Sequence, residues 1–179
     1  MSFRLLTLCG RKIAMTVHDL VLTPTGLLFR GRRFPCSIGR GGLRRYKREG
    51  DAGTPAGIHH IVMMLYRPDR IRPPAHWAEP ILPGDLWSDA SDDPAYNQPV
   101  RAPYAPSHEM LRRADPLYDL VLATDWNWPD AVAGRGSCIF VHQWRRPGFP
   151  TEGCVALKRT DLHWIAARIA PGARLIVGR

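Results

Sequence analysis

A histidine and a cysteine stand twelve residues apart in the C-terminal third of the chain, a pairing suited to nucleophilic catalysis. His142 follows the apolar run 139–141, and Cys154 follows Gly153 within the stretch 150–157. A free thiol has a pKa of about 8.5, so at neutral pH it needs a neighbouring imidazole to take its proton. The glycine lets the backbone turn tightly and lets amide N–H groups face a developing oxyanion. The pair predicts acyl transfer by Cys154 with His142 as general base.

The remaining cysteines and histidines favour ordinary packing roles. Cys138 lies inside an apolar run, and Cys9 and Cys36 also fit the buried structural role that is common for cysteine. No CxxC spacing occurs, and the seven histidines form no zinc-ligand pattern with the four cysteines, so we expect no metal and no organic cofactor. The other single histidines are more often surface or core groups than catalytic ones; they include residues 59, 60, 76, 108 and 163.

The elements that would position this pair are mostly strands. The run Ser137–Val141 predicts a strand that ends at His142, and a turn signal at Pro24–Gly26 predicts a hairpin between strands 15–22 and 27–30. Further strands are expected at 58–65, 117–124 and 175–177. Thr160 is a candidate N-cap for one helix, whose apolar spacing runs to Ile169 before Pro171 and Gly172 stop it. These patterns predict a mainly β fold, a β-rich α+β chain, with one C-terminal helix.

A long segment interrupts this pattern at about residues 66–116. Nine of the seventeen prolines lie between Pro68 and Pro106, together with Trp77, Trp87, Tyr96 and Tyr104. Disordered linkers are usually poor in aromatic residues, so this mixture favours an irregular but packed insertion. With no linker or repeat in evidence, we expect residues 1–179 to form a single domain.

The charge of the chain is strongly positive and unevenly placed. The net charge is +9, and residues 1–48 hold eleven Lys or Arg against the single acid Asp19. Such a field suits nucleic acid, a carboxylate-bearing cell-wall polymer or an anionic lipid surface. No window reaches the roughly 18 apolar residues that span a bilayer, and no export signal is visible, so we expect no transmembrane segment.

Three motifs resemble one known family. Thr151-Glu152-Gly153-Cys154 matches the Ser/Thr-x-Gly-Cys signature of the YkuD-type L,D-transpeptidase catalytic domain, in which a strand-borne histidine precedes the motif. The glycine-rich stretch 39–42 and the segment 49–57, which holds Thr54-Pro55-Ala56-Gly57 before a predicted strand, are also similar to that family. The resemblance covers about residues 15–178.

The resemblance implies a YkuD-like β-sandwich or barrel that acts on the stem peptides of peptidoglycan through a Cys154 thioester. In such a site the Gln143 backbone carbonyl orients His142, and the backbone amides of Gly153 and Cys154 bind the oxyanion. The expected product is a cross-link to a diaminopimelate side-chain amine, either 3-3 or 1-3 through L-Ala. The resemblance also implies action in the periplasm or cell envelope, with muropeptides as the partner. We expect a monomer and no nucleic-acid partner.

Several departures from the family pattern leave the scissile stem bond open. Glu152 stands where a histidine or similar residue is usual, and Ala156 stands where an Arg or Asn is usual. The interval from His142 to Cys154 is short, and the insertion at about 66–116 is not a standard part of the small domain. A proteobacterial subgroup that forms cross-links through the first stem residue resembles this variant.

Candidate substrate-binding residues surround the motif or lie in the basic third of the chain. Trp144 is a candidate wall, and Thr151 and Glu152 flank the nucleophile, although Glu152 equally suits a solvent-exposed place. Basic side chains match stem carboxylates but are equally typical of a solvated face; they are Arg44, Arg45 and Lys47. His108 either lines the pocket or opens a short helical turn, and the structural role is favoured.

Two other functions compete with transpeptidation. An L,D-carboxypeptidase or endopeptidase would use the same Cys-His site and release free acids, and the sequence does not separate it from a transpeptidase. A basic, non-catalytic binding module would need RNA-binding aromatics or a recognition helix with clustered bases, and neither pattern is present.

Overall fold

The structure is a computed structural model that describes residues 5–8 and 11–178, with side chains described from residue 14 onward. As predicted, it is mainly β, with a single α-helix among the described residues. The strands are β1 Leu5–Leu8, β2 Arg11–Ala14, β3 Leu20–Thr23, β4 Gly26–Phe29, β5 Arg32–Phe34, β6 Cys36–Ser37, β7 Leu43–Arg44, β8 Thr54–Pro55, β9 Gly57–Tyr66, β10 Glu79–Pro80, β11 Asp85–Ser88, β12 Pro99–Arg101, β13 His108–Met110, β14 Leu120–Thr124, β15 Phe140–Gln143, β16 Val155–Leu157 and β17 Arg174–Val177. The helices are the 3-10 turn η1 Pro116–Tyr118 and α1 Arg159–Ala166.

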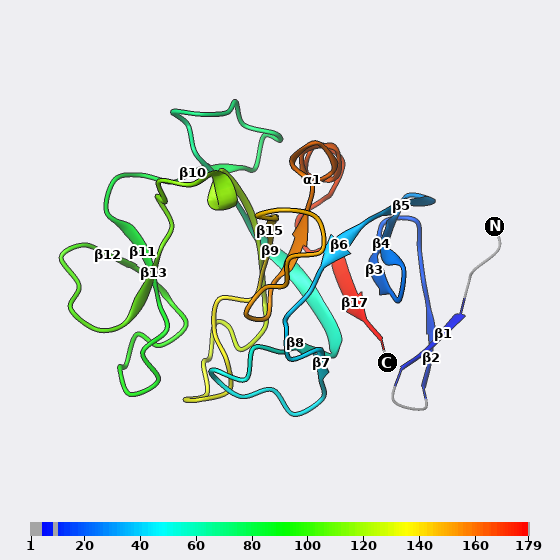
Figure 1. The fold of residues 1–179 in the computed structure, drawn as a ribbon, viewed down its shortest axis with the longest axis horizontal. Coiled ribbons are helices and arrows are strands. Elements are labelled where there is room, and N and C mark those ends of the chain that lie inside the picture. The colour runs from blue at the N-terminus through cyan, green and yellow to red at the C-terminus, as the bar shows by residue number, and fades with distance from the viewer. Residues whose placement is uncertain (1–4, 9–10, 179) are drawn as a thin grey trace.

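One large sheet organises the molecule (Figure 1). Its strand order is β5-β4-β3-β17-β9-β14-β15-β16-β6, with β10 added beside β9. The outermost strands β5 and β6 lie at opposite ends of this order, yet only Pro35 separates them in the chain. The sheet must therefore curl until its two edges approach each other, which gives it the form of a nearly closed barrel.

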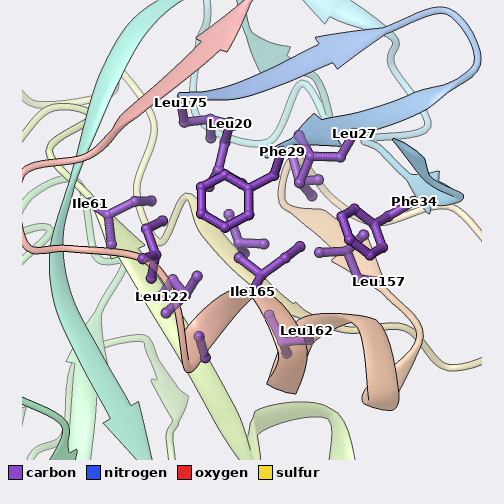
Figure 2. Packing of buried hydrophobic residues seen from close by; sticks show 14 of the residues in the cluster. Leu20, Leu27, Phe29, Phe34, Ile61, Leu122, Leu157, Leu162, Ile165 and Leu175 are labelled. Atoms are coloured by element: carbon purple, nitrogen blue, oxygen red, sulfur yellow. The ribbon is translucent and has the colours of Figure 1, made fainter. Parts of the chain in front are cut away.

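Helix α1 packs on one face of this curled sheet. Its Leu162, Ile165 and Ala166 are fully buried in the main core cluster. Figure 2 shows Leu162 and Ile165 pointing into the same cluster as Leu20, Phe29 and other side chains from the strands. The helix repeats apolar residues at helical spacing, which places them on one side of it and so fixes that side against the sheet.

The opposite face of the central strands is buried as well. In β14, Leu120 and Leu122 belong to the core beneath α1, whereas Val121 and Ala123 belong to a second cluster on the other face. Strand side chains alternate between faces, so Phe140 lies with the second cluster and Val141 with the first. This second cluster is the one that contains Cys154.

The insertion covers this second face, and it is more regular than predicted. Its strands β11, β12 and β13 form a three-stranded antiparallel sheet in the order β12-β11-β13, which stands apart from the large sheet in Figure 1. Trp87 of β11 is buried and packs edge-on against Phe140 at a centroid distance of 5.2 Å. The strands were not predicted because of the many prolines, which lie in the turns between the strands and at the start of β12 and interrupt the strand pattern in the sequence.

The two ends of the insertion are held together by arginines. The Arg67 guanidinium donates to the Arg113 carbonyl oxygen at 2.6 Å, and Arg70 donates to Asp119 at 2.8 Å and to the Ala114 carbonyl oxygen at 2.8 Å. Because the chain leaves and re-enters the large sheet at neighbouring points, the insertion extends from the sheet without breaking it.

Several predicted boundaries were wrong. The strand expected at Ser137–Val141 is β15, which begins at Phe140 and runs through Gln143, because the left-handed backbone of Cys138, with a φ of +52°, interrupts the extended chain before it. Thr160 lies inside α1 rather than at its N-cap, a position held by Lys158 without a side-chain hydrogen bond, and Ile169 is buried beyond the end of the helix. The strand expected at 117–124 begins at Leu120, because Pro116 starts a 3-10 turn whose Leu117 amide donates to Asp115. The first strand of the predicted hairpin begins at residue 20 rather than 15. The expectation of a single domain stays a prediction.

Candidate active site

His142 lies on β15, and Cys154 directly precedes the neighbouring parallel strand β16. In the pairing of β15 with β16, His142 is opposite Ala156 and Val141 is opposite Val155. Because side chains alternate along a strand, Cys154 and Ala156 share the face of His142. Both His142 and Cys154 line a cleft with a volume of about 590 Å³, whose walls include parts of the insertion. The predicted catalytic pair is therefore brought to one site.

The imidazole of His142 is oriented by the main chain. Its Nδ1 atom lies 2.8 Å from the Gln143 carbonyl oxygen, and since a carbonyl only accepts, Nδ1 carries the proton and Nε2 keeps a lone pair. The ring packs edge-on against Tyr118 at 5.3 Å. Burial lowers the pKa of His142 to about 4, and the nearby charge of Arg113 adds to this effect. At neutral pH the ring is a neutral base.

Cys154 is 9% exposed and rests as a neutral thiol. Its Sγ donates to the Cys138 carbonyl oxygen at 3.0 Å and accepts from the Phe140 amide at 3.4 Å. Burial raises the pKa of Cys154 to about 12, an effect that the Phe140 amide and the charge of Lys47 oppose and the charge of Glu109 reinforces.

No hydrogen bond joins the thiol to His142 among the described residues, although the sequence predicted that contact. The thiol must therefore rotate away from the Cys138 carbonyl oxygen to reach the imidazole. Catalytic hydrogen bonds are often long or misaligned before substrate binds, so this arrangement is compatible with proton transfer in the complex. The resting site consists of a neutral thiol and a neutral imidazole rather than an ion pair.

The turn before the nucleophile explains the Thr-x-Gly-Cys pattern. The Thr151 hydroxyl donates to the Cys154 carbonyl oxygen at 2.6 Å and accepts from the Gly153 amide at 3.2 Å. Gly153 has a φ of +148°, and a Cβ there would lie 2.9 Å from the Gly53 carbonyl oxygen. The Gly153 amide therefore donates to Thr151 in this resting arrangement. The sequence had predicted that it would be free to bind the oxyanion, together with the Cys154 amide.

The two glycine-rich stretches predicted to allow close backbone approach pack against this turn. A Cβ on Gly39 would lie 2.3 Å from the Ala52 carbonyl oxygen and 3.0 Å from the Gly153 Cα. The Arg40 amide donates to the Thr151 carbonyl oxygen at 2.8 Å, and the Thr151 amide donates to the Ile38 carbonyl oxygen at 3.0 Å. These contacts fix the loop that carries Cys154 against the loops at 39–42 and 51–54.

Four of the seven predicted substrate-binding residues line the cleft, namely Trp144, Thr151, Glu152 and Lys47, whereas Arg44, Arg45 and His108 do not. Arg44 packs across Gly53, and Arg45 lies over the ring of Tyr46. His108 packs against Tyr104 and bonds the Pro106 carbonyl oxygen.

Lys47 is buried, and its ammonium is satisfied by donation to Asp51 and to the Arg48 carbonyl oxygen, both at 2.7 Å. Glu152 is largely exposed and pairs with Arg40 at 2.9 Å.

The cleft also contains charged residues that were not among the predicted site residues. Glu49 accepts from Ser137 at 2.8 Å and from Tyr96 at 2.5 Å. Glu109 lies beside the predicted His108, and burial, reinforced by the charge of Asp89, raises its pKa. Neighbouring residues of β13 point to opposite faces of the strand. Which of His108 and Glu109 faces the cleft therefore depends on the orientation of the strand, which the sequence does not show.

Neither a metal centre nor a membrane span is found in the described part of the chain. No cluster of three or more His, Cys, Asp or Glu side chains suitable for a metal occurs there. Within residues 5–8 and 11–178, no helix has the length and apolar character needed to cross a bilayer.

Comparisons with known proteins bear on what this site does. The family model of the YkuD L,D-transpeptidase catalytic domain matches residues 23–177. Among solved structures, an L,D-transpeptidase from Mycobacterium smegmatis is similar, with a TM-score of 0.43, 14% sequence identity and 98% of this chain covered. This chain spans 66% of the length of that protein. No curated protein matches the chain.

Proposed function

The chain belongs to the YkuD family of L,D-transpeptidase catalytic domains, and from this membership we propose that it transfers acyl groups between peptidoglycan stem peptides with Cys154 as nucleophile. The observation that carries the proposal is that His142 on β15 and Cys154, directly before the neighbouring strand β16, line one common cleft. The tautomer of His142 supports the same role, because it leaves Nε2 free to accept a proton. The substrate would be a muropeptide of the cell envelope, which places the proposed site of action in the periplasm.

In the first half of the reaction, the Cys154 thiol leaves the Cys138 carbonyl oxygen and gives its proton to His142 Nε2. The sulfur then attacks the carbonyl carbon of an L,D peptide bond in a donor stem. The carbon–nitrogen bond breaks, and the leaving amine takes the proton from the imidazolium. A thioester remains on Cys154.

In the second half, an acceptor amine attacks the thioester carbonyl and passes its proton to His142. The carbon–sulfur bond breaks, and the imidazolium returns the proton to the sulfur. A diaminopimelate side-chain amine as acceptor yields a cross-link, of the 3-3 type if the donor bond follows the third residue and of the 1-3 type if it follows L-Ala. Water as acceptor yields a shortened stem, the carboxypeptidase or endopeptidase outcome.

The oxyanion of the tetrahedral intermediates would be bound by backbone amides at the turn. The Cys154 amide is the candidate donor, and the Gly153 amide joins it only if the Thr151 hydroxyl releases it. Lys47 adds positive charge at this wall of the cleft. We further propose that residues 1–179 act as one domain and as a monomer without a cofactor.

Product analysis tests this function. Wild type, Cys154→Ala and the control Cys36→Ala, which changes a half-buried cysteine outside the cleft, are incubated with tetrapeptide-stem muropeptides. We expect dimers from wild type and Cys36→Ala, none from Cys154→Ala, and fragmentation by mass spectrometry to locate the new bond. Shortened monomers without dimers would make the protein a hydrolase, and unchanged substrate would favour the non-catalytic binding module.

A further inference from the structure

One asparagine of the insertion uses every hydrogen-bonding position of its side chain. Asn97 is 2% exposed and lies between β11 and β12. Its Nδ2 donates to the Asn127 carbonyl oxygen at 2.7 Å and to the Trp126 carbonyl oxygen at 3.1 Å. Its Oδ1 accepts from the Trp87 indole at 2.9 Å and from the Cys138 amide at 3.0 Å. A carboxamide has two donors and two lone pairs, so its full capacity is used.

The last of these bonds leads directly to the nucleophile. The Cys138 amide is held by Asn97, and the carbonyl oxygen of the same residue accepts the Cys154 thiol at 3.0 Å. Cys138 has a φ of +52°, a left-handed conformation that is costly for a residue other than glycine. Such a conformation persists only where its surroundings impose it, and the bond to Asn97 is the side-chain contact on the Cys138 amide.

We propose that Asn97 is a positioning residue for the nucleophile, because its carboxamide fixes the Cys138 backbone whose carbonyl oxygen holds the Cys154 thiol. The proposal rests on the proposed function, since it assumes that Cys154 is the nucleophile. It gives the insertion a role in the chemistry: residues 41 positions apart in the chain meet at the resting place of the thiol.

This resting place acts on the protonation of the thiol. Donation to a carbonyl oxygen stabilises the thiol over the thiolate, so release from Cys138 should make Cys154 easier to deprotonate. Further titratable groups surround the Cys154 sulfur. In the described structure none of them makes a hydrogen bond with the Asn97 side chain. They are His142, Glu109, Lys47, Tyr118 and the Cys138 thiol.

The chain offers a matched control for this residue. Asn127 is also a buried asparagine with a positive φ, +52° against +55° for Asn97. Its carboxamide bonds Val132 and the Gly136 carbonyl oxygen, and it makes no hydrogen bond to Cys138. Glycine tolerates both backbone conformations, so Asn97→Gly and Asn127→Gly each remove a carboxamide without adding backbone strain.

The test is the pH profile of Cys154 alkylation by iodoacetamide, measured on the full chain by peptide mass spectrometry. No peptide substrate is needed, so the result stands whether or not muropeptides are turned over. Because burial raises the pKa of Cys154 to about 12, the profiles are compared below the midpoint, where the rate rises about tenfold for each pH unit. We expect Asn97→Gly to raise the rate there about tenfold, which corresponds to a midpoint lower by about one pH unit. Asn127→Gly should leave the midpoint at the wild-type value, although both variants lose thermal stability.

An unchanged midpoint in Asn97→Gly, or an equal change in Asn127→Gly, would overturn the proposal. Asn97→Asp provides a second variant if Asn97→Gly does not fold, because it keeps an oxygen that accepts from Cys138. Its midpoint should lie at or above the wild-type value, and a lower one would also overturn the proposal. If muropeptides are not converted by wild type, the proposed function fails, while the alkylation profile still decides the role of Asn97.

Discussion

The buried imidazole of His142 makes the stability of the protein depend on pH. Burial lowers its pKa to about 4 from an ordinary value of 6.5. Above pH 6.5 the ring is neutral in both the folded and the unfolded chain and contributes no pH dependence. Between pH 6.5 and about 4 only the unfolded chain binds the proton, so the free energy of unfolding falls with the pH. At roughly 1.4 kcal/mol per pH unit, the loss reaches about 3 kcal/mol at pH 4.

His142→Gln isolates this loss, because glutamine does not titrate. Urea unfolding of both proteins from pH 8 to pH 4 gives the difference between their free energies of unfolding at each pH. From pH 8 to pH 4, the free energy of unfolding of the variant should rise by about 3 kcal/mol relative to that of wild type. This change does not depend on what the substitution costs at pH 8. His59 and His163, whose pKa values burial also lowers, are present in both proteins and cancel. A difference that stays constant with pH would contradict the lowered pKa of His142, since the imidazole would then accept a proton in the folded state as readily as in the unfolded chain.

Three further substitutions test the packing around the site. In Gly153→Ala the new Cβ would lie 2.9 Å from the Gly53 carbonyl oxygen, and thermal unfolding should show a loss of roughly 1–3 kcal/mol; a neutral effect would mean that the turn adapts. Phe140→Ala empties a fully buried site and should lower the free energy of urea unfolding by about 3–5 kcal/mol, whereas a loss below about 1 kcal/mol would contradict its central place in the second cluster. Glu49→Gln weakens the acceptor for the Tyr96 and Ser137 hydroxyls and should cost about 1–3 kcal/mol in the same assay, and no cost would show that solvent replaces the carboxylate.

Local patterns predicted the elements whose physical cause is local. The strand at 58–65 and the hairpin around Pro24–Gly26 follow from apolar runs and turn residues, and they appear as β9 and the β3–β4 pair. The helix was predicted from apolar spacing, but its predicted N-cap at Thr160 was wrong, because Lys158 takes that position without a side-chain hydrogen bond. The sheet order was beyond local patterns, since β17 pairs with β3 from the other end of the chain.

The same limit applies to the site. The histidine and the cysteine were found because their types and the adjoining glycine indicate chemistry by themselves. Lys47 was placed in a group with Arg44 and Arg45, and only the fold shows that Lys47 alone lines the cleft. Lys47 donates to Asp51, and the sequence does show this acid four residues after the lysine. No comparable sequence feature marks Asn97, because its contact with the Cys138 segment depends on how the insertion folds back onto β14 and β15.

Identification of the covalent intermediate tests the proposed mechanism most directly. Wild type is incubated with a tetrapeptide-stem muropeptide, quenched in acid and examined by intact-mass and peptide-mapping mass spectrometry, with Cys154→Ala treated in parallel. We expect an acyl adduct on Cys154 that hydroxylamine removes, as a thioester requires, and no adduct in Cys154→Ala. Product formation without an adduct, an adduct on another residue, or undiminished turnover in Cys154→Ala would contradict the proposed mechanism.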